Sequence, residues 1–379
     1  MIAQAKILSV ILAIVAALAT ALPACAFETA GREAVMVDAA TGRVLFEKNA
    51  DARMPPASMS KIMTLYVIFQ RIKDGRLSLS DEFTVSEKAW RMGGSKMFVE
   101  VNSRVKVEDL LRGVIIQSGN DASIVLAEGV AGSEEAFAAE MNRAAEEMGL
   151  TGSHFVNATG WPHPDHYMTV RDLATLALHT INDFPEYYHL YSEKEFTWNG
   201  ITQGNRNPLL YRAINVDGLK TGHTEDAGFC LTASAVEDDR RLVLVISGLN
   251  SMQQRADESD RVLSWGFREF DNYKLFTAGD TVETAPVWLG ETESVPLVVN
   301  QDLLATFSHK ERQEMEVKVV YEGPIAAPIA NGQQAGKVVV SAPGTTPVEV
   351  PLVAGAAVPR LGPLGRIMAS IKYLIFGPT

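Results

Sequence analysis

PPASMSKIMTLYVIFQRIK, at residues 55–73, is a strongly apolar run introduced by two prolines. Pro55 and Pro56 stop any upstream helix, and no Gly or Pro follows Ser58 until Gly75. Residues 59–73 are therefore predicted to form a helix, with Ser58 at or just before its first turn. Apolar residues occupy nearly every side of this helix, which indicates that it is buried.

Ser58 and Lys61 are three residues apart and so share one face of this helix. A serine at a buried helix N-terminus, with an amine one turn away, has the arrangement of an activated nucleophile. The alternative is a helix-capping serine followed by an unrelated lysine. The same Ser-xx-Lys spacing recurs at residues 103–106, so the motif alone does not decide between the two.

The first 26 residues are predicted to be a secretory signal peptide. Lys6 is followed by a long apolar run that ends in the small residues Ala24-Cys25-Ala26. The alternative is an N-terminal helix that stays in the membrane. Cleavage would leave Cys230 as the sole cysteine, which we expect to pack as a small buried hydrophobic residue. A net charge of −12 argues against a nucleic-acid or polyanion binder.

Residues 27–275 have the pattern of an α+β domain. A hairpin is expected at 34–48, and three closely connected strands around 219–249 predict an antiparallel sheet. The expected helices after 59–73 are 107–117, 122–131, 133–148, one that starts at Thr169, and 261–270.

Residues 277–352 are rich in Val, Thr, Pro and Gly and predict a separate all-β domain. The expected strands are VETAPVWL (282–289), SVPLVV (294–299), EVKVVYE (316–322), KVVVSA (337–342) and VEVPLV (348–353).

Residues 353–379 are predicted to be a linker and an amphipathic helix. A helix over 363–376 would be about 21 Å long, whereas a membrane span needs about 30 Å. Its apolar residues form one stripe, and basic residues accompany it without an acid among residues 360–379. This pattern favours a helix lying on an anionic membrane surface, and the alternative is a helix docked on its own β-domain.

Two further motifs accompany Ser58-xx-Lys61. Ser118-Gly119-Asn120 falls between two expected helices, and Lys220-Thr221-Gly222 falls on an expected strand. The histidines at 154, 163 and 166 lie in a loop with two prolines and lack a helical i, i+4 pair, so we expect neither a metal nor another cofactor.

The ordered set Ser-xx-Lys, Ser-x-Asn and Lys-Thr-Gly resembles the penicillin-binding, active-site-serine enzymes. Within them the chain is similar to the low-molecular-mass D-alanyl-D-alanine carboxypeptidases, over nearly the whole chain after the signal peptide. The resemblance implies a β-lactamase/transpeptidase-like domain, a small all-β domain and an anchoring helix. The matching stretches are PPASMSKIMT, LLRGVIIQSGNDA, NATGWPHPDHYMTVRDLA, DGLKTGHTEDAG and LSWGFREF.

The resemblance implies three catalytic residues. Ser58 would attack the carbonyl of the penultimate D-alanine, and Lys61, neutral through burial and the nearby charge of Lys220, would take its proton. Ser118 would relay the proton toward the leaving amine, and water would then hydrolyse the acyl-enzyme.

The resemblance also implies the substrate-binding residues. Asn120 would orient Lys61 and bind the substrate amide, and Lys220 and Thr221 would face the terminal carboxylate, with help from Arg255. The backbone N–H groups of Ser58 and His223, the latter just after Gly222, would form the oxyanion hole. Trp161 stands where an aliphatic residue is commoner, which bears on substrate preference.

The expected partners are peptidoglycan pentapeptides ending in D-Ala-D-Ala, β-lactams that acylate Ser58, and a membrane surface at residues 360–379. The expected location is the periplasm, at the outer face of the inner membrane. The alternatives are a D,D-endopeptidase of the same superfamily, a serine β-lactamase, and a peptidoglycan binder without activity. No Glu-xx-Leu-Asn stretch supplies the base that a β-lactamase needs for deacylation.

Overall fold

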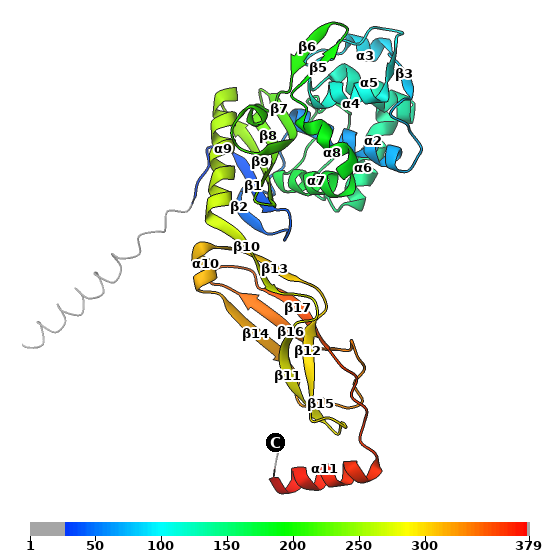
Figure 1. Ribbon diagram of the computed structural model, residues 1–379. Coiled ribbons are helices and arrows are strands. Elements are labelled where there is room, and N and C mark those ends of the chain that lie inside the picture. Colours follow the sequence, from blue (N-terminus) through cyan, green and yellow to red (C-terminus); the bar gives the residue numbers. More distant parts are fainter. Residues whose placement is uncertain (1–26, 377–379) are drawn as a thin grey trace, which may run out of the picture.

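The computed structural model describes residues 27–376, so the predicted signal peptide lies outside the described residues. Two domains follow one another along the length of the molecule, and a helix lies at the end remote from the first domain (Figure 1). The first domain contains helices and a sheet, and the second contains mainly strands. The α+β class, the following all-β domain and their order are as predicted.

The sheet of the first domain has five antiparallel strands in the order β2-β1-β9-β8-β7. The predicted hairpin is confirmed, with Met36 opposite Phe46. The three predicted strands near 219–249 are also confirmed, and they form one edge and the centre of the sheet. The strands are β1 (Glu33–Asp38), β2 (Val44–Lys48), β7 (Val216–Thr224), β8 (Gly228–Glu237) and β9 (Arg240–Leu249).

Both faces of this sheet are buried, each in its own hydrophobic core. Side chains alternate between the faces of a strand, so Val35 and Val37 lie in one core and Ala34 and Met36 in the other. The first core is shared with the layer of helices, and the second with α9 (Met252–Glu269) on the opposite face (Figure 1). The domain therefore has three layers, with the sheet between helices.

The helical layer surrounds α2, nine of whose residues are buried. All five helices predicted for this layer are present, with ends within about two residues of those predicted, and the remaining short helices were not predicted. The helices are η1 (Ala57–Ser60), α2 (Lys61–Lys73), α3 (Glu87–Arg91), α4 (Val107–Ile115), α5 (Asn120–Ala131), α6 (Glu134–Glu147), α7 (Val170–Asp183), α8 (Pro185–Tyr188), η2 (His189–Ser192) and η3 (Pro208–Tyr211). Two small hairpins complete the layer, β3 (Glu82–Thr84) with β4 (Arg104–Lys106), and β5 (Glu195–Trp198) with β6 (Ile201–Gly204).

The prediction of a helix over 261–270 is wrong at its start, and its end is one residue too late. Helix α9 begins at Met252, where the side chain of Ser251 accepts a hydrogen bond from the backbone N–H of Gln254. The first half of α9 buries Arg255 and Ser259 instead of an apolar stripe, so apolar periodicity could not reveal it. At the other end, Phe270 already belongs to the next strand.

The second domain is built on a six-stranded sheet in the order β14-β16-β17-β12-β11-β15. All five strands predicted from the sequence are present, as β11, β12, β14, β16 and β17. Strand β10 (Phe270–Phe276) pairs with β13 (Leu303–Ser308), so residues 270–276 belong to this domain, ahead of the expected boundary at 275–277. The other elements are β11 (Thr281–Trp288), β12 (Ser294–Val299), α10 (His309–Gln313), β14 (Glu316–Tyr321), β15 (Ile325–Ala326), β16 (Gln334–Ser341) and β17 (Val348–Ala354).

Polar contacts around Asp38 fasten the two domains together. The Asp38 carboxylate is fully buried, pairs with Arg240 Nε at 2.8 Å and accepts a hydrogen bond from Asn272 Nδ2 at 3.3 Å. Nearby, Arg43 Nη2 pairs with Glu311 Oε1 at 2.7 Å. Asn272 and Glu311 belong to the second domain, so their contacts with Asp38 and Arg43 join it to the first domain, whereas the pair of Asp38 with Arg240 lies within the first domain.

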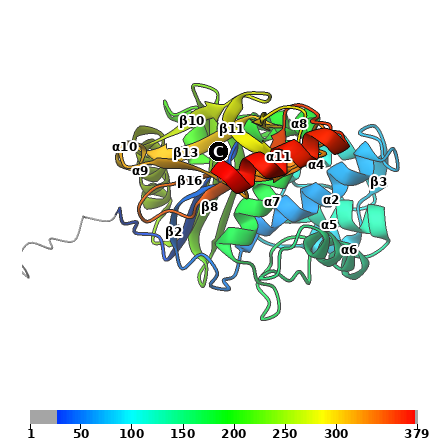
Figure 2. The same ribbon diagram turned by 90° about the horizontal axis from the view of Figure 1, so that it is seen from below.

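Helix α11 (Pro363–Phe376) lies beyond the second domain and crosses in front of it when the molecule is seen from below (Figure 2). Its described apolar side chains are exposed and leave an unpacked apolar surface: Leu364, Ile367, Met368, Ile371, Leu374 and Ile375. No helix within residues 27–376 is long and apolar enough to span a bilayer.

Candidate active site

The centre of the site is the start of α2, where the three motifs predicted from the sequence meet. Ser58 lies in the 3-10 turn η1, and Lys61 follows as the first residue of α2. Lys61 is fully buried, and its Nζ lies 2.8 Å from Ser58 Oγ, 2.8 Å from Asn120 Oδ1 and 2.5 Å from the carbonyl oxygen of Thr159. Ser58 itself is only partly buried, so its hydroxyl is within reach of a substrate.

Burial lowers the pKa of Lys61 to about 7, because the ammonium form loses its hydration. The positive charge of Arg206 contributes to this lowering, and the carboxylates of Asp121 and Glu134 act in the opposite direction. Lys61 and Lys220 repel each other, as expected, because the charge of Lys61 lowers the pKa of Lys220, and Arg206 is a further cation that was not expected. At neutral pH a substantial fraction of Lys61 is therefore an uncharged amine that can accept a proton.

Acylation of Ser58 by penicillin is expected to depend on pH through Lys61. Below a pKa of about 7 the amine is protonated and cannot act as a base, so the rate should fall about tenfold per pH unit. The measurement is the second-order acylation rate across the pH range, with thermal unfolding followed in parallel to show that the protein stays folded. A midpoint near the ordinary lysine value of 10.5 would contradict the assignment.

Ser118 and Lys220 form a second buried hydrogen-bonded pair. Lys220 lies on β7 and its Nζ donates to Ser118 Oγ at 2.9 Å. Ser118 has φ +59 and lies in the short segment 116–119 between α4 and α5. Burial lowers the pKa of Lys220 well below its ordinary value, and the charges of Lys61, Arg206 and Arg255 lower it further. The ammonium of Lys220 therefore needs an anion beside it.

Strand β7 runs along the turn that carries Ser58. A Cβ atom at Gly222 would lie 2.9 Å from the carbonyl oxygen of Pro56 and 3.2 Å from Ala57 Cβ, so only glycine allows this approach. Thr221 is buried beside it, whereas His223 is exposed and stacks on Phe229 at 3.9 Å. The Lys-Thr-Gly stretch thus borders the turn that carries Ser58.

Arg255 reaches the site from the first turn of α9. Its side chain is buried, its Nη2 donates to the carbonyl oxygen of Arg206 at 3.5 Å, and its Nε has no hydrogen-bond partner within the described chain. Burial lowers the pKa of Arg255. A buried guanidinium with a free N–H group is suited to bind an anion.

Arg206 is a site residue that sequence analysis missed. It lies between the buried residues Asn205 and Asn207, and its Nη1 donates to Ser95 Oγ. Within residues 27–376, none of Lys220, Arg206 and Arg255 forms an ion pair with a carboxylate. No motif marks QGNRNPLL, and only the two amides that flank a lone cation could have drawn attention to it.

Trp161 forms one wall beside Asn120. Its indole packs on Gly93 and Gly94, where a Cβ atom at Gly94 would lie 3.3 Å from the ring and 2.9 Å from Asn120 Nδ2. Trp161 is 47% exposed, so half of its surface is available to a bound molecule. The unusual tryptophan noted in the sequence thus lies at the edge of the site.

His166, in the loop that also carries His154 and His163, makes a buried contact with the turn that precedes α2. His166 is buried, its Nε2 lies 2.8 Å from Ser60 Oγ, and burial lowers its pKa to about 4. Within residues 27–376, no group of three or more His, Cys, Asp or Glu side chains is arranged to hold a metal ion.

A serine next to a buried amine, at the start of a helix and bordered by an antiparallel strand, is the arrangement of a serine hydrolase. The family model of the D-alanyl-D-alanine carboxypeptidases, peptidase S11, matches residues 19–251, and that of the C-terminal domain of penicillin-binding protein 5 matches residues 270–360. The chain therefore belongs to the D-alanyl-D-alanine carboxypeptidase family and is a low-molecular-mass penicillin-binding protein.

Curated relatives and solved structures agree with this family. The D-alanyl-D-alanine carboxypeptidase DacA of Escherichia coli is 37% identical over 90% of this chain and 86% of its own length. A D-alanyl-D-alanine endopeptidase of Escherichia coli is 30% identical over 66% of this chain and 82% of its own length. The crystal structure of penicillin-binding protein 5 from Haemophilus influenzae matches with a TM-score of 0.79 and 37% identity, over 88% of this chain and 99% of that one.

Proposed function

We propose that this chain, a serine-type D-alanyl-D-alanine carboxypeptidase, removes the terminal D-alanine from peptidoglycan pentapeptides through an acyl-enzyme on Ser58. The observation that carries the proposal is the position of Lys61 Nζ, 2.8 Å from the hydroxyl of Ser58 in a buried site that favours the neutral amine. A general base must lie within hydrogen-bond reach of the proton that it removes, with a pKa near the working pH.

In the acylation step, Ser58 Oγ bonds to the carbonyl carbon of the penultimate D-alanine while Lys61 Nζ takes the hydroxyl proton. The carbon–nitrogen bond to the last D-alanine then breaks, and the leaving nitrogen receives a proton through Ser118. The backbone N–H groups of Ser58 and His223 stabilise the oxyanion. Water next hydrolyses the ester, and Ser58 regains its proton. A β-lactam would acylate the same hydroxyl.

Lys220, Arg206 and Arg255 form a group of cations without a carboxylate partner in the described chain. The terminal carboxylate of the substrate would supply that anion. Lys220 and Arg255 are the predicted binding groups, together with the hydroxyl of Thr221, and Arg206 adds a third cation. Burial lowers the pKa of all three side chains, which means that it disfavours their charged forms, so a bound carboxylate would stabilise the charges. Recognition of a free carboxylate is what distinguishes removal of a terminal residue from cleavage within a chain.

The test combines labelled penicillin with three peptide substrates: a pentapeptide ending in D-Ala-D-Ala, its C-terminal amide, and a cross-linked dimer. We expect a stable penicillin label and release of D-alanine from the free pentapeptide only. Rapid loss of the label would indicate a β-lactamase, cleavage of the dimer alone an endopeptidase, and absence of label a binder without activity. Each of these three results would overturn the proposal.

The proposed location is the periplasm, after export by residues 1–26, with the protein held on the outer face of the inner membrane by residues 360–379. The exposed apolar side chains of α11, such as Leu364 at 81% and Leu374 at 82%, support this. An amphipathic helix with basic residues and no neighbouring acid is suited to lie in an anionic bilayer surface.

Deletion of residues 360–379 is expected to release the protein from membranes with its D-alanine release intact. Helix α11 carries the exposed apolar surface and lies at the end of the molecule remote from α2 (Figure 1). The measurement is sedimentation with anionic vesicles, followed by the activity of the supernatant. As a matched control, Val317 and Val320, exposed on β14, are replaced by serine, which should leave binding unchanged. Continued sedimentation of the deletion variant would contradict the anchor.

A further inference from the structure

Residues 157–161 pack directly on the turn that carries Ser58. Gly160 has φ +73, and a Cβ atom there would lie 1.9 Å from the carbonyl oxygen of Ala57. No L-residue with a side chain fits such a gap without moving one of the two segments. The carbonyl of Thr159, one residue earlier, is the group that accepts the 2.5 Å hydrogen bond from Lys61 Nζ.

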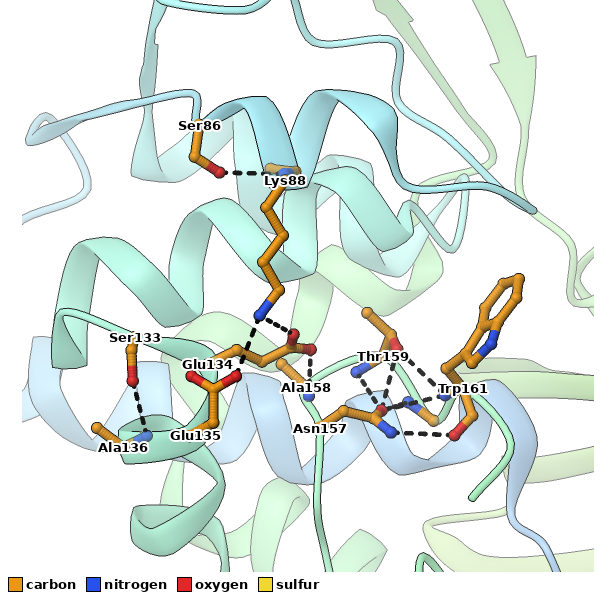
Figure 3. A network of polar contacts seen from close by, with 12 residues as sticks. Ser86, Lys88, Ser133, Glu134, Glu135, Ala136, Asn157, Ala158, Thr159 and Trp161 are labelled. Carbon is orange, nitrogen blue, oxygen red and sulfur yellow. Dashed lines mark hydrogen bonds and ion pairs between the residues drawn. The ribbon is translucent and has the colours of Figure 1, made fainter.

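The side chain of Asn157 holds this segment in a closed turn (Figure 3). Its Oδ1 accepts hydrogen bonds from the backbone N–H groups of Thr159, Gly160 and Trp161 at 3.1, 2.8 and 3.1 Å, and from Thr159 Oγ1 at 3.0 Å. Its Nδ2 donates to the carbonyl oxygen of Trp161 at 3.0 Å. One amide therefore fixes the backbone on both sides of the Thr159 carbonyl.

The side chain of Glu134 holds Ala158, the residue between Asn157 and Thr159. Glu134 Oε1 accepts a hydrogen bond from the backbone N–H of Ala158 at 3.1 Å, and Glu134 Oε2 pairs with Lys88 Nζ at 2.9 Å (Figure 3). Glu134 is almost completely buried, and the carboxylate is satisfied by the pair and the backbone. Four of the five residues in the segment thus donate their backbone N–H to a buried or half-buried side chain.

The carbonyl of Thr159 matters because of the geometry of a neutral amine. The uncharged side chain of Lys61 has two N–H groups and one lone pair. Asn120 Oδ1 and the Thr159 carbonyl are two acceptors within 2.8 Å of Nζ, and together they can take both N–H groups. The lone pair then points at the third neighbour, the hydroxyl of Ser58, in the orientation needed to remove its proton.

We propose that Asn157 is a positioning residue for the reaction: it holds the Thr159 carbonyl so that the lone pair of Lys61 faces Ser58. This inference rests on the proposed role of Lys61 as the base. Without Asn157, the carbonyl moves and the amine can turn another N–H group toward Ser58. A displacement of about 1 Å near reacting groups can cost about 100-fold in rate.

The test compares Asn157→Ala with a matched control, Asn142→Ala. Asn142 braces the backbone two residues upstream, since its Nδ2 donates to the Phe155 carbonyl at 2.7 Å and its Oδ1 accepts from Phe155 N–H at 2.9 Å. Both variants should lower the melting temperature. Only Asn157→Ala should slow acylation by labelled penicillin, by about 100-fold.

A third variant, Asn157→Asp, keeps the acceptor oxygen but adds a carboxylate. It should recover most of the acylation rate at alkaline pH and less near neutrality, since its charge would raise the pKa of Lys61. Arg206, Asp121 and Glu134 already act on Lys61, and the variant changes none of them. This pH-dependent rescue would not arise if Asn157 only stabilised the fold.

Equal slowing in the Asn142 and Asn157 variants would overturn the proposal, as would an unchanged rate in Asn157→Ala or a failure of Asn157→Asp to recover at alkaline pH. Labelling of the unmodified protein and of Asn142→Ala separates this outcome from a failure of the proposed function, because absence of label in those two proteins would contradict the function itself.

Discussion

Replacement of Ser58 by alanine is expected to abolish both penicillin labelling and release of D-alanine. The change removes the only hydroxyl that Lys61 Nζ reaches, at 2.8 Å, within the described part of the chain. Loss of a serine nucleophile that works together with its base lowers turnover by roughly a millionfold. The measurements are gel fluorescence with labelled penicillin and D-alanine release from the pentapeptide.

The matched control for Ser58→Ala is Ser103→Ala, in the second Ser-xx-Lys pattern. Ser103 Oγ donates to the carbonyl of Glu100 at 2.6 Å on an exposed segment, away from Lys61. This control should label and release D-alanine like the unmodified protein. Retained D-alanine release by Ser58→Ala would reject the acyl-enzyme mechanism.

Replacement of Lys61 by arginine is expected to lower the rate of acylation by roughly 10²- to 10⁴-fold. The guanidinium keeps a positive charge and hydrogen-bond donors, but it stays protonated and cannot accept the proton of Ser58. The variant therefore tests whether Lys61 acts as a base or only as a positive charge. The measurement is the second-order rate constant for penicillin acylation, with circular dichroism to establish that the larger side chain is accommodated.

Lys106→Arg, in the same second pattern, is the control for Lys61→Arg, because Lys106 is exposed and precedes α4. Its rate should be unchanged. A Lys61→Arg variant that acylates as fast as the unmodified protein would show that a fixed positive charge suffices at this position, and the assignment of Lys61 as the base would then fail.

Most of the fold could be predicted because its elements are amphipathic or wholly buried. The hairpin of β1 and β2, the strands β7 to β9 and five strands of the second domain all follow apolar periodicity. The first half of α9 could not be found in this way, because the residues that it buries include Arg255 and Ser259. A helix face made of functional and small polar residues carries no hydrophobic signal.

In the site, the side chains of the motifs could be predicted from the sequence, but a backbone group could not. Ser58, Lys61, Ser118 and Lys220 belong to ordered motifs, and the structure brings them within hydrogen-bond distance in two pairs. The carbonyl of Thr159 could not be predicted, since every residue has a carbonyl and its position depends on the fold.

Arg206 escaped prediction for a different reason. Its effect on Lys61 depends on the approach of a loop that is far away in the sequence, and no recurring motif surrounds it. Charges that act through space are visible only after the chain has been folded.

The buried carboxylate of Asp38 has a consequence for how far the catalytic domain can reach. The same carboxylate accepts hydrogen bonds from the turn between β1 and β2, pairs with Arg240 and contacts Asn272 in the first strand of the second domain. A pivot between the domains would have to break the contact with Asn272 and the ion pair of Arg43 with Glu311. If α11 rests on a bilayer, the catalytic serine therefore stands at a set height above it, and only cell-wall strands that pass at that height can be trimmed.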